Sequence, residues 1–304
     1  MTLATNSAEI PLPNKELFSH RNPYFGEHVK KIMGKGLARP DNLVPLSKKI
    51  LLITTHRCGS HLFFDVLNNT NSVGYIEEWF NPSMFGLEKD ISLDYEDYLS
   101  FVLRKTSQRD ISILPVHVEF LEYYKKAKFF DLVKHYKPTC TFYLARRDVK
   151  AQIYSYAKSL ANDEWVTYKD SPRTPSTKDV LYATHGILKQ ISYFNKNLKK
   201  EVTSTFYIED FMDLENPTAF EEVLSYCSVE TSELKYFTNL KKQEGSITHI
   251  EFFGELHDVV KKVIDYSLEK CCTRKLYTVL EIIEHNGIES TDSICAVVEQ
   301  IFGK

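Results

Sequence analysis

Short apolar runs alternate with helix-like segments over much of the chain, and this alternation constrains the fold more than any other feature. Between the runs, apolar residues recur with the spacing of an amphipathic helix. Because the runs are continuously apolar, we expect strands buried on both faces, as in a parallel sheet covered by helices on each side. The four clearest runs cover residues 49–55, 111–120, 139–148 and 204–211. The sequence therefore predicts an α/β fold, with a further short strand at residues 73–76.

The strand pattern stops near residue 250, and the rest of the chain has the spacing of helices. Earlier helices are expected to begin near Ser60 and at a cap formed by Ser92 or Asp94, and one helix is expected over residues 123–136. The first 20 residues are polar and proline-containing, which is typical of a loose arm. We therefore predict a flexible arm (1–20), an α/β domain (21–250) and a helical C-terminal extension (251–304) that packs on the same domain.

Composition narrows the classes of partner. Lysine and arginine total 38 against 41 acidic residues, which gives a net charge of −3. A dedicated nucleic-acid binder usually carries a basic excess, so no nucleic acid is expected as a partner. No apolar run approaches the roughly 18 residues of a membrane span, and the N-terminus lacks the apolar core of a signal peptide. These features predict a cytoplasmic protein without a membrane span.

The six cysteines show no spacing typical of a disulfide framework. The adjacent Cys271 and Cys272 lack histidines at zinc-ligand spacing, so no structural metal is expected. Free thiols in a reducing compartment are the simplest interpretation.

The turn after the first strand, T-T-H-R-C-G-S-H at residues 54–61, is the first candidate site. Ligands of parallel sheets bind at the carboxyl ends of the strands. A helix N-terminus with a nearby positive side chain favours a phosphate or a sulfate. The turn is not an ATP-binding P-loop, because the pattern G-x-x-x-x-G-K-[ST] is absent. Taken alone, a tight turn with a solvated arginine explains these residues equally well.

Three motifs, taken in order, are similar to those of the Stf0 family of sulfotransferases, which use 3′-phosphoadenosine 5′-phosphosulfate (PAPS). H-R-C-G-S-H at residues 56–61 resembles Q-R-S-G-S-T, and G-Y-I-E-E-W-F at 74–80 resembles G-E-P-x-E-F-F. A strand that ends R-R-D at 146–148 is followed by Gln152, Ser155 and, further on, a tryptophan. The resemblance covers roughly residues 49–245. It implies a P-loop-like sheet, PAPS as the donor and PAP as the product.

The resemblance also implies which residues bind the cofactor. The first loop would hold the phosphosulfate, and Arg147 with Ser155 would hold the 3′-phosphate. Lys241 and Lys242 occupy the place of a basic residue near the nucleotide, although an exposed charged turn explains them nearly as well. Trp165 would stack on adenine or pack in the core. The residues of the first loop are Arg57, Cys58, Gly59, Ser60 and His61.

The proposed base of the family falls on Glu78, which would accept the proton of the acceptor hydroxyl as it attacks sulfur. His117, at the end of another predicted strand, would touch the acceptor or assist as an acid or base. The alternatives are that Glu78 is a surface acid and that His117 has a purely structural role. Arg57 would neutralise the charge that develops on the bridging oxygen. No metal is implied.

The sequence departs from the family pattern beside the acceptor, where Tyr75 and Ile76 replace an E-P pair. This change favours a less polar acceptor than trehalose, or a sugar stacked on Tyr75. The prediction is therefore sulfuryl transfer to a hydroxyl, less commonly an amine, of a small molecule or carbohydrate. Two alternatives remain: a P-loop-type nucleotide-dependent phosphotransferase, and a catalytically silent sulfotransferase-like binding protein. The resemblance also allows a homodimer.

Overall fold

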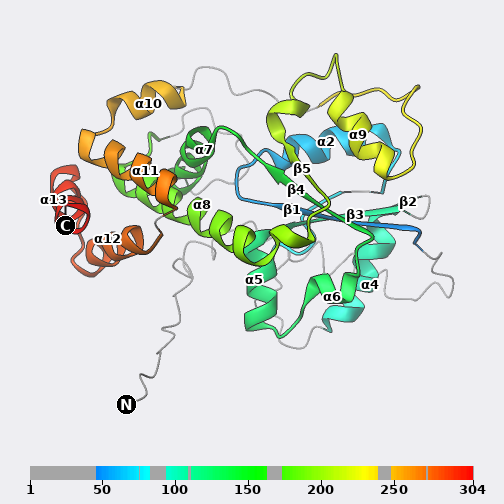
Figure 1. Cartoon of the computed structure of the whole chain (residues 1–304), viewed down its shortest axis with the longest axis horizontal. Coiled ribbons are helices and arrows are strands. Elements are labelled where there is room, and N and C mark those ends of the chain that lie inside the picture. The colour runs from blue at the N-terminus through cyan, green and yellow to red at the C-terminus, as the bar shows by residue number, and fades with distance from the viewer. Residues whose placement is uncertain are drawn as a thin grey trace.

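A parallel sheet forms the centre of the molecule in the computed structural model (Figure 1). The residues described are 46–74, 76–82, 94–108, 111–162, 173–238, 248–271 and 273–303. The predicted N-terminal arm lies outside them.

Four parallel strands lie in the order β3-β1-β4-β5, and a two-residue strand, β2, pairs antiparallel with the outer edge of β3. Thr54, the last residue of β1, lies opposite His117 on β3 and Leu144 on β4. The predicted α/β fold with a parallel sheet is therefore confirmed. The strands are β1 (Lys48–Thr54), β2 (Ser107–Gln108), β3 (Ile111–His117), β4 (Cys140–Ala145) and β5 (Ser204–Tyr207).

Helices cover both faces of the sheet because successive strand residues point to opposite sides. Leu51 and Ile53 of β1 pack with α4, α5, α6 and the end of α8, whereas Ile50 and Leu52 pack with α2 and α9. Asp94 accepts hydrogen bonds from the N–H groups of Glu96 and Asp97, so it caps α4 as predicted. The helices of these layers are α2 (Ser60–Thr70), α4 (Tyr95–Thr106), α5 (Val118–Ala127), α6 (Leu132–Tyr136), α8 (Thr177–Asn197) and α9 (Thr218–Tyr226).

Several predicted elements differ from those observed. The strand predicted over 111–120 ends at His117, where α5 follows, and the strand predicted over 139–148 ends at Ala145. Residues 73, 74 and 76 are not in a strand, and the side chain of Asn68 hydrogen-bonds to both the N–H and the C=O of Ile76 instead. The helix predicted over 123–136 is divided into α5 and α6, with Phe129 in the left-handed region at φ 52°. The last predicted strand ends at Tyr207, and a 3₁₀ turn (Ile208–Phe211) follows. At these places, hydrogen bonds from side chains or within turns replace the regular hydrogen bonds of a strand or a helix.

The C-terminal helices pack on two helices of the α/β part, α7 and the first two-thirds of α8 (Figure 1). Val180 and Ile187 of α8 lie in a buried cluster with Leu276 and Val298, whereas Phe194 near the end of α8 belongs to the core beside the sheet. The long α8 thus joins the two cores. Within the described ranges, no helix is long and apolar enough to cross a membrane. The remaining helices are α7 (Val149–Asn162), α10 (His249–Glu255), α11 (Asp258–Lys270), α12 (Thr273–His285) and α13 (Thr291–Phe302).

Candidate functional site

The candidate site lies where the parallel strands end. β1 ends at Thr54 and leads into the loop 55–59, β3 ends at His117, and Arg146 directly follows β4. Glu78 reaches the same edge from the segment 76–82, and its carboxylate contacts His117. Parallel strands bring their carboxyl ends to one edge of a sheet, so the topology collects these side chains.

The loop 55–59 has a strained backbone held by its neighbours. Arg57 has φ 59° and Gly59 has φ 95°, both in the left-handed region. A Cβ on Gly59 would lie 2.4 Å from Cγ1 of Ile208, so both conformation and space require glycine here. The side-chain amide of Gln152 on α7 donates to Oγ1 of Thr55 (2.9 Å) and to the carbonyl of His56 (2.6 Å). The loop is therefore fixed before any ligand binds.

Positive charge gathers around the amino end of α2. The Nε of Arg57 donates to Oγ of Ser155 at 2.9 Å, and Nη1 of Arg146 lies 3.4 Å from the carbonyl oxygen of Arg57. Burial and the nearby charge of Arg146 lower the pKa of Arg57, and burial and Arg57 lower that of Lys158. Within the described ranges, Nε of Arg146 is buried without a hydrogen-bond partner. Two adjacent arginines at a helix N-terminus form a site suited to an anion.

Glu78, His117 and Thr54 form a buried polar chain. Oε1 of Glu78 lies 2.8 Å from Nε2 of His117, whose Nδ1 lies 3.0 Å from Oγ1 of Thr54. Asn81 donates to the other carboxylate oxygen of Glu78 at 2.9 Å. The side chains of Glu78 and His117 are 7% and 5% exposed. Glu78 is thus neither a surface acid nor isolated.

These contacts set the protonation of the pair. Burial alone would raise the pKa of Glu78, but the hydrogen bonds from His117 and Asn81, together with the nearby His61, hold it below its ordinary value. Burial lowers the pKa of His117 and outweighs the attraction of Glu78. A neutral His117 can donate a hydrogen bond from Nε2 to an ionised Glu78 and accept one at Nδ1 from the hydroxyl of Thr54. In this arrangement each of the three groups has a hydrogen-bond partner.

Arg147 does not meet Ser155, although the resemblance assigns both to one phosphate. Its guanidinium forms two hydrogen bonds with the carboxylate of Asp210, at 2.7 and 2.8 Å, and lies 4.4 Å from the ring centroid of Tyr207. Arg147 is half-exposed at the ends of β4 and β5. The partner of Ser155 is instead Arg57. In this structure Arg147 therefore contacts the acidic turn after β5, and the binding of one phosphate by Arg147 and Ser155 stays a prediction.

The other predicted residues have different positions. Cys58 is fully buried, and burial raises its pKa to about 11, so its side chain belongs to the core and only its backbone lines the turn. His61 is half-exposed, with Nε2 3.9 Å from Oε1 of Glu78. Ser60 begins α2 and is buried. Tyr75, Trp165, Lys241 and Lys242 lie outside the described residues.

Sequence reasoning missed a second acid–histidine pair at the same edge. Nε2 of His56 lies 3.1 Å from Oε2 of Glu119 on α5, and the backbone N–H of His56 donates to Gln190 on α8. The position of Glu119, two residues after His117, was the available signal. The chain passes from β3 into α5 between these two residues, so their spacing does not show where the carboxylate of Glu119 points.

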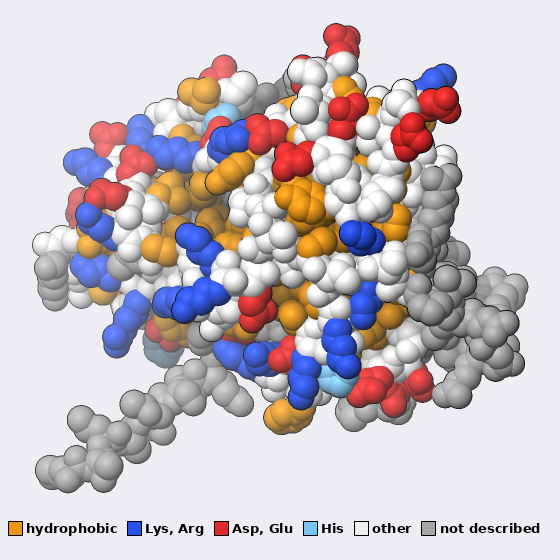
Figure 2. All heavy atoms as spheres, turned by 45° about the vertical axis from the view of Figure 1, so that its right-hand side comes forward, with side chains coloured by type: hydrophobic (Ala, Val, Ile, Leu, Met, Phe, Trp, Pro, Cys, Tyr) orange, Lys and Arg blue, Asp and Glu red, His pale blue; other side chains and the backbone are white. Residues whose placement is uncertain are grey.

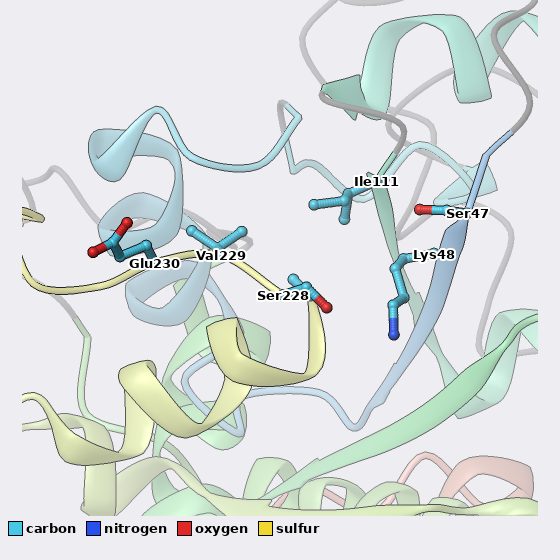
Figure 3. A pocket seen from close by; sticks show the side chains of 7 residues that line it. Ser47, Lys48, Ile111, Ser228, Val229 and Glu230 are labelled. Carbon is cyan, nitrogen blue, oxygen red and sulfur yellow. The ribbon is translucent and has the colours of Figure 1, made fainter.

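A cavity among the described residues is remote from this edge. It has a volume of about 450 Å³ and lies at the amino ends of β1 and β3, between Lys48 and Ile111 on one side and Ser228 and Glu230 on the other (Figure 3). Its lining lacks the paired arginines and buried carboxylate found at the carboxyl edge. We therefore assign the chemistry to the carboxyl edge.

On the face shown in Figure 2, basic and acidic side chains alternate over the C-terminal helices. The grouping of Arg57, Arg146 and Lys158 is thus a local feature. Among the described residues, no group of three or more histidine, cysteine, aspartate or glutamate side chains could hold a metal ion.

A scan against protein-family models and a search of curated proteins found no match to this chain.

Proposed function

We propose that this protein transfers the sulfuryl group of PAPS to a hydroxyl group of a small molecule or carbohydrate. The observation that carries the proposal is the Arg57–Ser155 hydrogen bond at the amino end of α2, beside the buried Glu78–His117 pair. An anion site and a carboxylate base next to each other are what transfer between two oxygen atoms requires.

The cofactor would bind with its negative groups at Arg57, Arg146 and the first turn of α2. The helix dipole favours an anion at the amino end of α2. Gly59 lets the backbone make the turn with Ile208 packed against it. Arg147 would contact the 3′-phosphate only after leaving Asp210, which makes that contact conditional.

The reaction needs one bond to form and one to break. The acceptor oxygen attacks sulfur, the bond from sulfur to the bridging phosphate oxygen breaks, and PAP leaves. Arg57 stabilises the charge that develops on the bridging oxygen. Glu78 takes the acceptor proton. The negative charge of the bound cofactor beside Arg57 offsets the positive surroundings of Glu78, which raises its pKa and makes it a stronger base.

The half-exposed His61 marks the direction from which the acceptor reaches Glu78. Its Nε2 lies 3.9 Å from the carboxylate, whereas His117 and Glu78 themselves are almost fully enclosed. A hydroxyl on a short or narrow group enters such a site more easily than one on a broad surface.

Thermal unfolding with nucleotides tests the proposal. A ligand that binds only the native state raises the melting temperature. We expect PAP to raise it without magnesium and ATP with magnesium to raise it much less. An equal or larger effect of ATP with magnesium would favour the phosphotransferase. Stabilisation by PAP without turnover of PAPS across an acceptor library would favour the binding protein.

A further inference from the structure

The turn between α5 and α6 presents an aromatic ring to solvent. The side chain of Phe129 is 91% exposed, more than any other large apolar side chain among the described residues. Its neighbour Phe130 is 5% exposed and stacks on the ring of His135, with the centroids 4.7 Å apart. The turn lies on the lower side of the molecule in the view of Figure 1. The proposed function gives Phe129 no role.

The backbone of this turn holds the ring of Phe129 outside the core. Phe129 has φ 52°, in the left-handed region that glycine and asparagine adopt most readily and a bulky side chain disfavours. The N–H groups of Lys128 and Phe130 both donate to the carbonyl of Tyr124, at 3.2 and 3.0 Å, and the ring of Phe130 packs in the core. Neither the exposure nor the conformation of Phe129 stabilises the isolated protein, which indicates a partner that covers the ring.

Four lysines lie within five residues of Phe129, in a chain whose net charge is −3. They are Lys125, Lys126, Lys128 and Lys134. The side chains of Lys125 and Lys126 are 63% and 71% exposed, and they contact Asp131 and Glu122. Exposed pairs of this kind are weak, and four lysines against two acids leave a net positive charge around the ring. The last turn of a helix favours lysines in any case, but Lys128 and Lys134 lie outside that turn of α5.

The shape and the charge of this surface decide which partner fits it. A peptide binds in a groove or along the edge of a sheet, whereas Phe129 projects from a turn. Lysines carry compact charges on flexible stems, which suits a layer of anionic headgroups, and an aromatic ring is stable at the boundary between headgroups and acyl chains. The exposed acid Glu96 contacts His135 in the last turn of α6, so the positive charge is concentrated at the end of α5. The surface therefore fits an anionic lipid bilayer better than an acidic peptide.

We propose that the α5–α6 turn docks this protein on the surface of an anionic lipid bilayer. The ring of Phe129 enters the boundary between headgroups and acyl chains, and the four lysines lie against the headgroups. One ring and a few lysines are a small anchor, so the binding is weak, reversible and sensitive to salt.

Docking at this turn does not cover the candidate site. His117 directly precedes the first residue of α5, whereas Phe129 follows its last residue, so the length of the helix separates the two. The carboxyl edge of the sheet stays open to its ligands while the turn is bound. This inference is therefore independent of the proposed function.

Co-sedimentation of the full-length protein with lipid vesicles tests the proposal. Vesicles of phosphatidylcholine are compared with vesicles that also contain phosphatidylserine. The bound fraction should rise with phosphatidylserine and fall when the salt is raised to about 0.5 M, where screening is strong. Phe129→Ala should lower the partition coefficient roughly tenfold, because it removes the apolar surface that enters the bilayer. Equal binding to both kinds of vesicle, or equal binding of wild type and Phe129→Ala, would overturn the proposal.

Two matched controls separate this surface from general adsorption. Met212 is 64% exposed but lies between the acids Asp210 and Asp213, so Met212→Ala should leave the partition coefficient unchanged. Lys126→Gln should lower binding to the phosphatidylserine vesicles several-fold. Lys270→Gln, at a 56% exposed lysine on α11, should have no effect. Losses of the same size at each control and its counterpart would overturn the proposal.

A further variant protects the test against a folding defect. Phe129→Asn removes the ring and suits the left-handed conformation, so it should keep the melting temperature of the wild type and bind vesicles as weakly as Phe129→Ala. Poly-glutamate serves as the competing probe. Binding to poly-glutamate with none to the anionic vesicles would assign the surface to an acidic protein and overturn the proposal.

Discussion

The Nε of Arg57 lies 2.9 Å from Oγ of Ser155, a residue 98 positions later in the chain. The sequence motif associates Ser155 with Arg147, which the fold directs toward Asp210 instead. Helix α7 therefore carries a candidate phosphate ligand, Ser155. The arginine that contacts it is Arg57, from the loop after β1. This relationship ties the loop to α7 and makes both part of the candidate anion site.

Arg147 can be tested through the residue that holds it. If Arg147 leaves Asp210 to bind the 3′-phosphate, Arg147→Ala should weaken PAP binding by roughly tenfold or more, as expected for a charge-assisted contact. Asp210→Asn removes the competing carboxylate and should strengthen binding. Calorimetry on folded variants measures both. Unchanged affinity in the two variants would show that the Arg147–Asp210 contact is purely structural.

Glu78→Gln tests the base. Glutamine keeps the size of the side chain, and its oxygen can still accept a hydrogen bond from His117 or from Asn81, but it cannot take the acceptor proton. Turnover should fall by about 10²–10⁴-fold, whereas PAP affinity should stay close to that of the wild type.

Glu77 provides the neighbouring control. Its carboxylate accepts the N–H of Glu78 at 3.0 Å, and glutamine can accept the same bond, so Glu77→Gln should cost far less activity. His117→Ala examines the rival base. Near-normal activity in Glu78→Gln together with loss in His117→Ala would transfer the role to the histidine.

Gly59→Ala should destabilise the protein and abolish PAP binding. Alanine at this position would have to adopt φ 95°, and its Cβ would lie 2.4 Å from Cγ1 of Ile208. The loop or the side chain of Ile208 therefore has to move. We expect a loss of roughly 1–3 kcal/mol in the free energy of unfolding by urea.

Two other glycines separate the causes. Gly287 has φ 59° with no atom near its Cβ position, so Gly287→Ala measures backbone strain alone and should cost less. Gly254 lies in α10 in open space without a positive φ, and Gly254→Ala should be neutral or slightly stabilising. Equal losses at Gly59 and Gly287 would show that the contact with Ile208 contributes nothing.

Because of His185 on α8, the folded protein should become less stable in acid. Burial and, to a smaller degree, Lys189 lower its pKa from 6.5 to about 4. The unfolded chain therefore binds a proton below pH 6.5 that the folded chain does not, so stability is full above that pH and falls as the pH decreases toward 4. His185→Gln should remove roughly 1–2 kcal/mol of the loss between pH 7 and pH 5, measured by urea unfolding. An unchanged pH slope would contradict this origin.

The sequence alone determined the parallel sheet and the edge at which its strands end. Continuous apolar runs predict strands buried on both faces, and the runs around Ile50, Leu114 and Phe142 are the central strands. Gly59 and Arg57 predicted an anion-binding turn after the first strand. That prediction needs only the local chemistry of the turn and the order of the strands. Turn hydrogen bonding limited this prediction at Ile76, where the side chain of Asn68 takes the place of a neighbouring strand.

Only the tertiary structure decided which side chains meet at that edge. The partnerships of Glu78 with His117 and of His56 with Glu119 join residues 39 and 63 positions apart. Arg57 contacts Ser155, whereas Arg147 contacts Asp210. Local periodicity fixes the direction of a side chain relative to its own helix or strand. It does not fix the competition between charged groups that arrive from different elements, and that competition selects the contacts of the site.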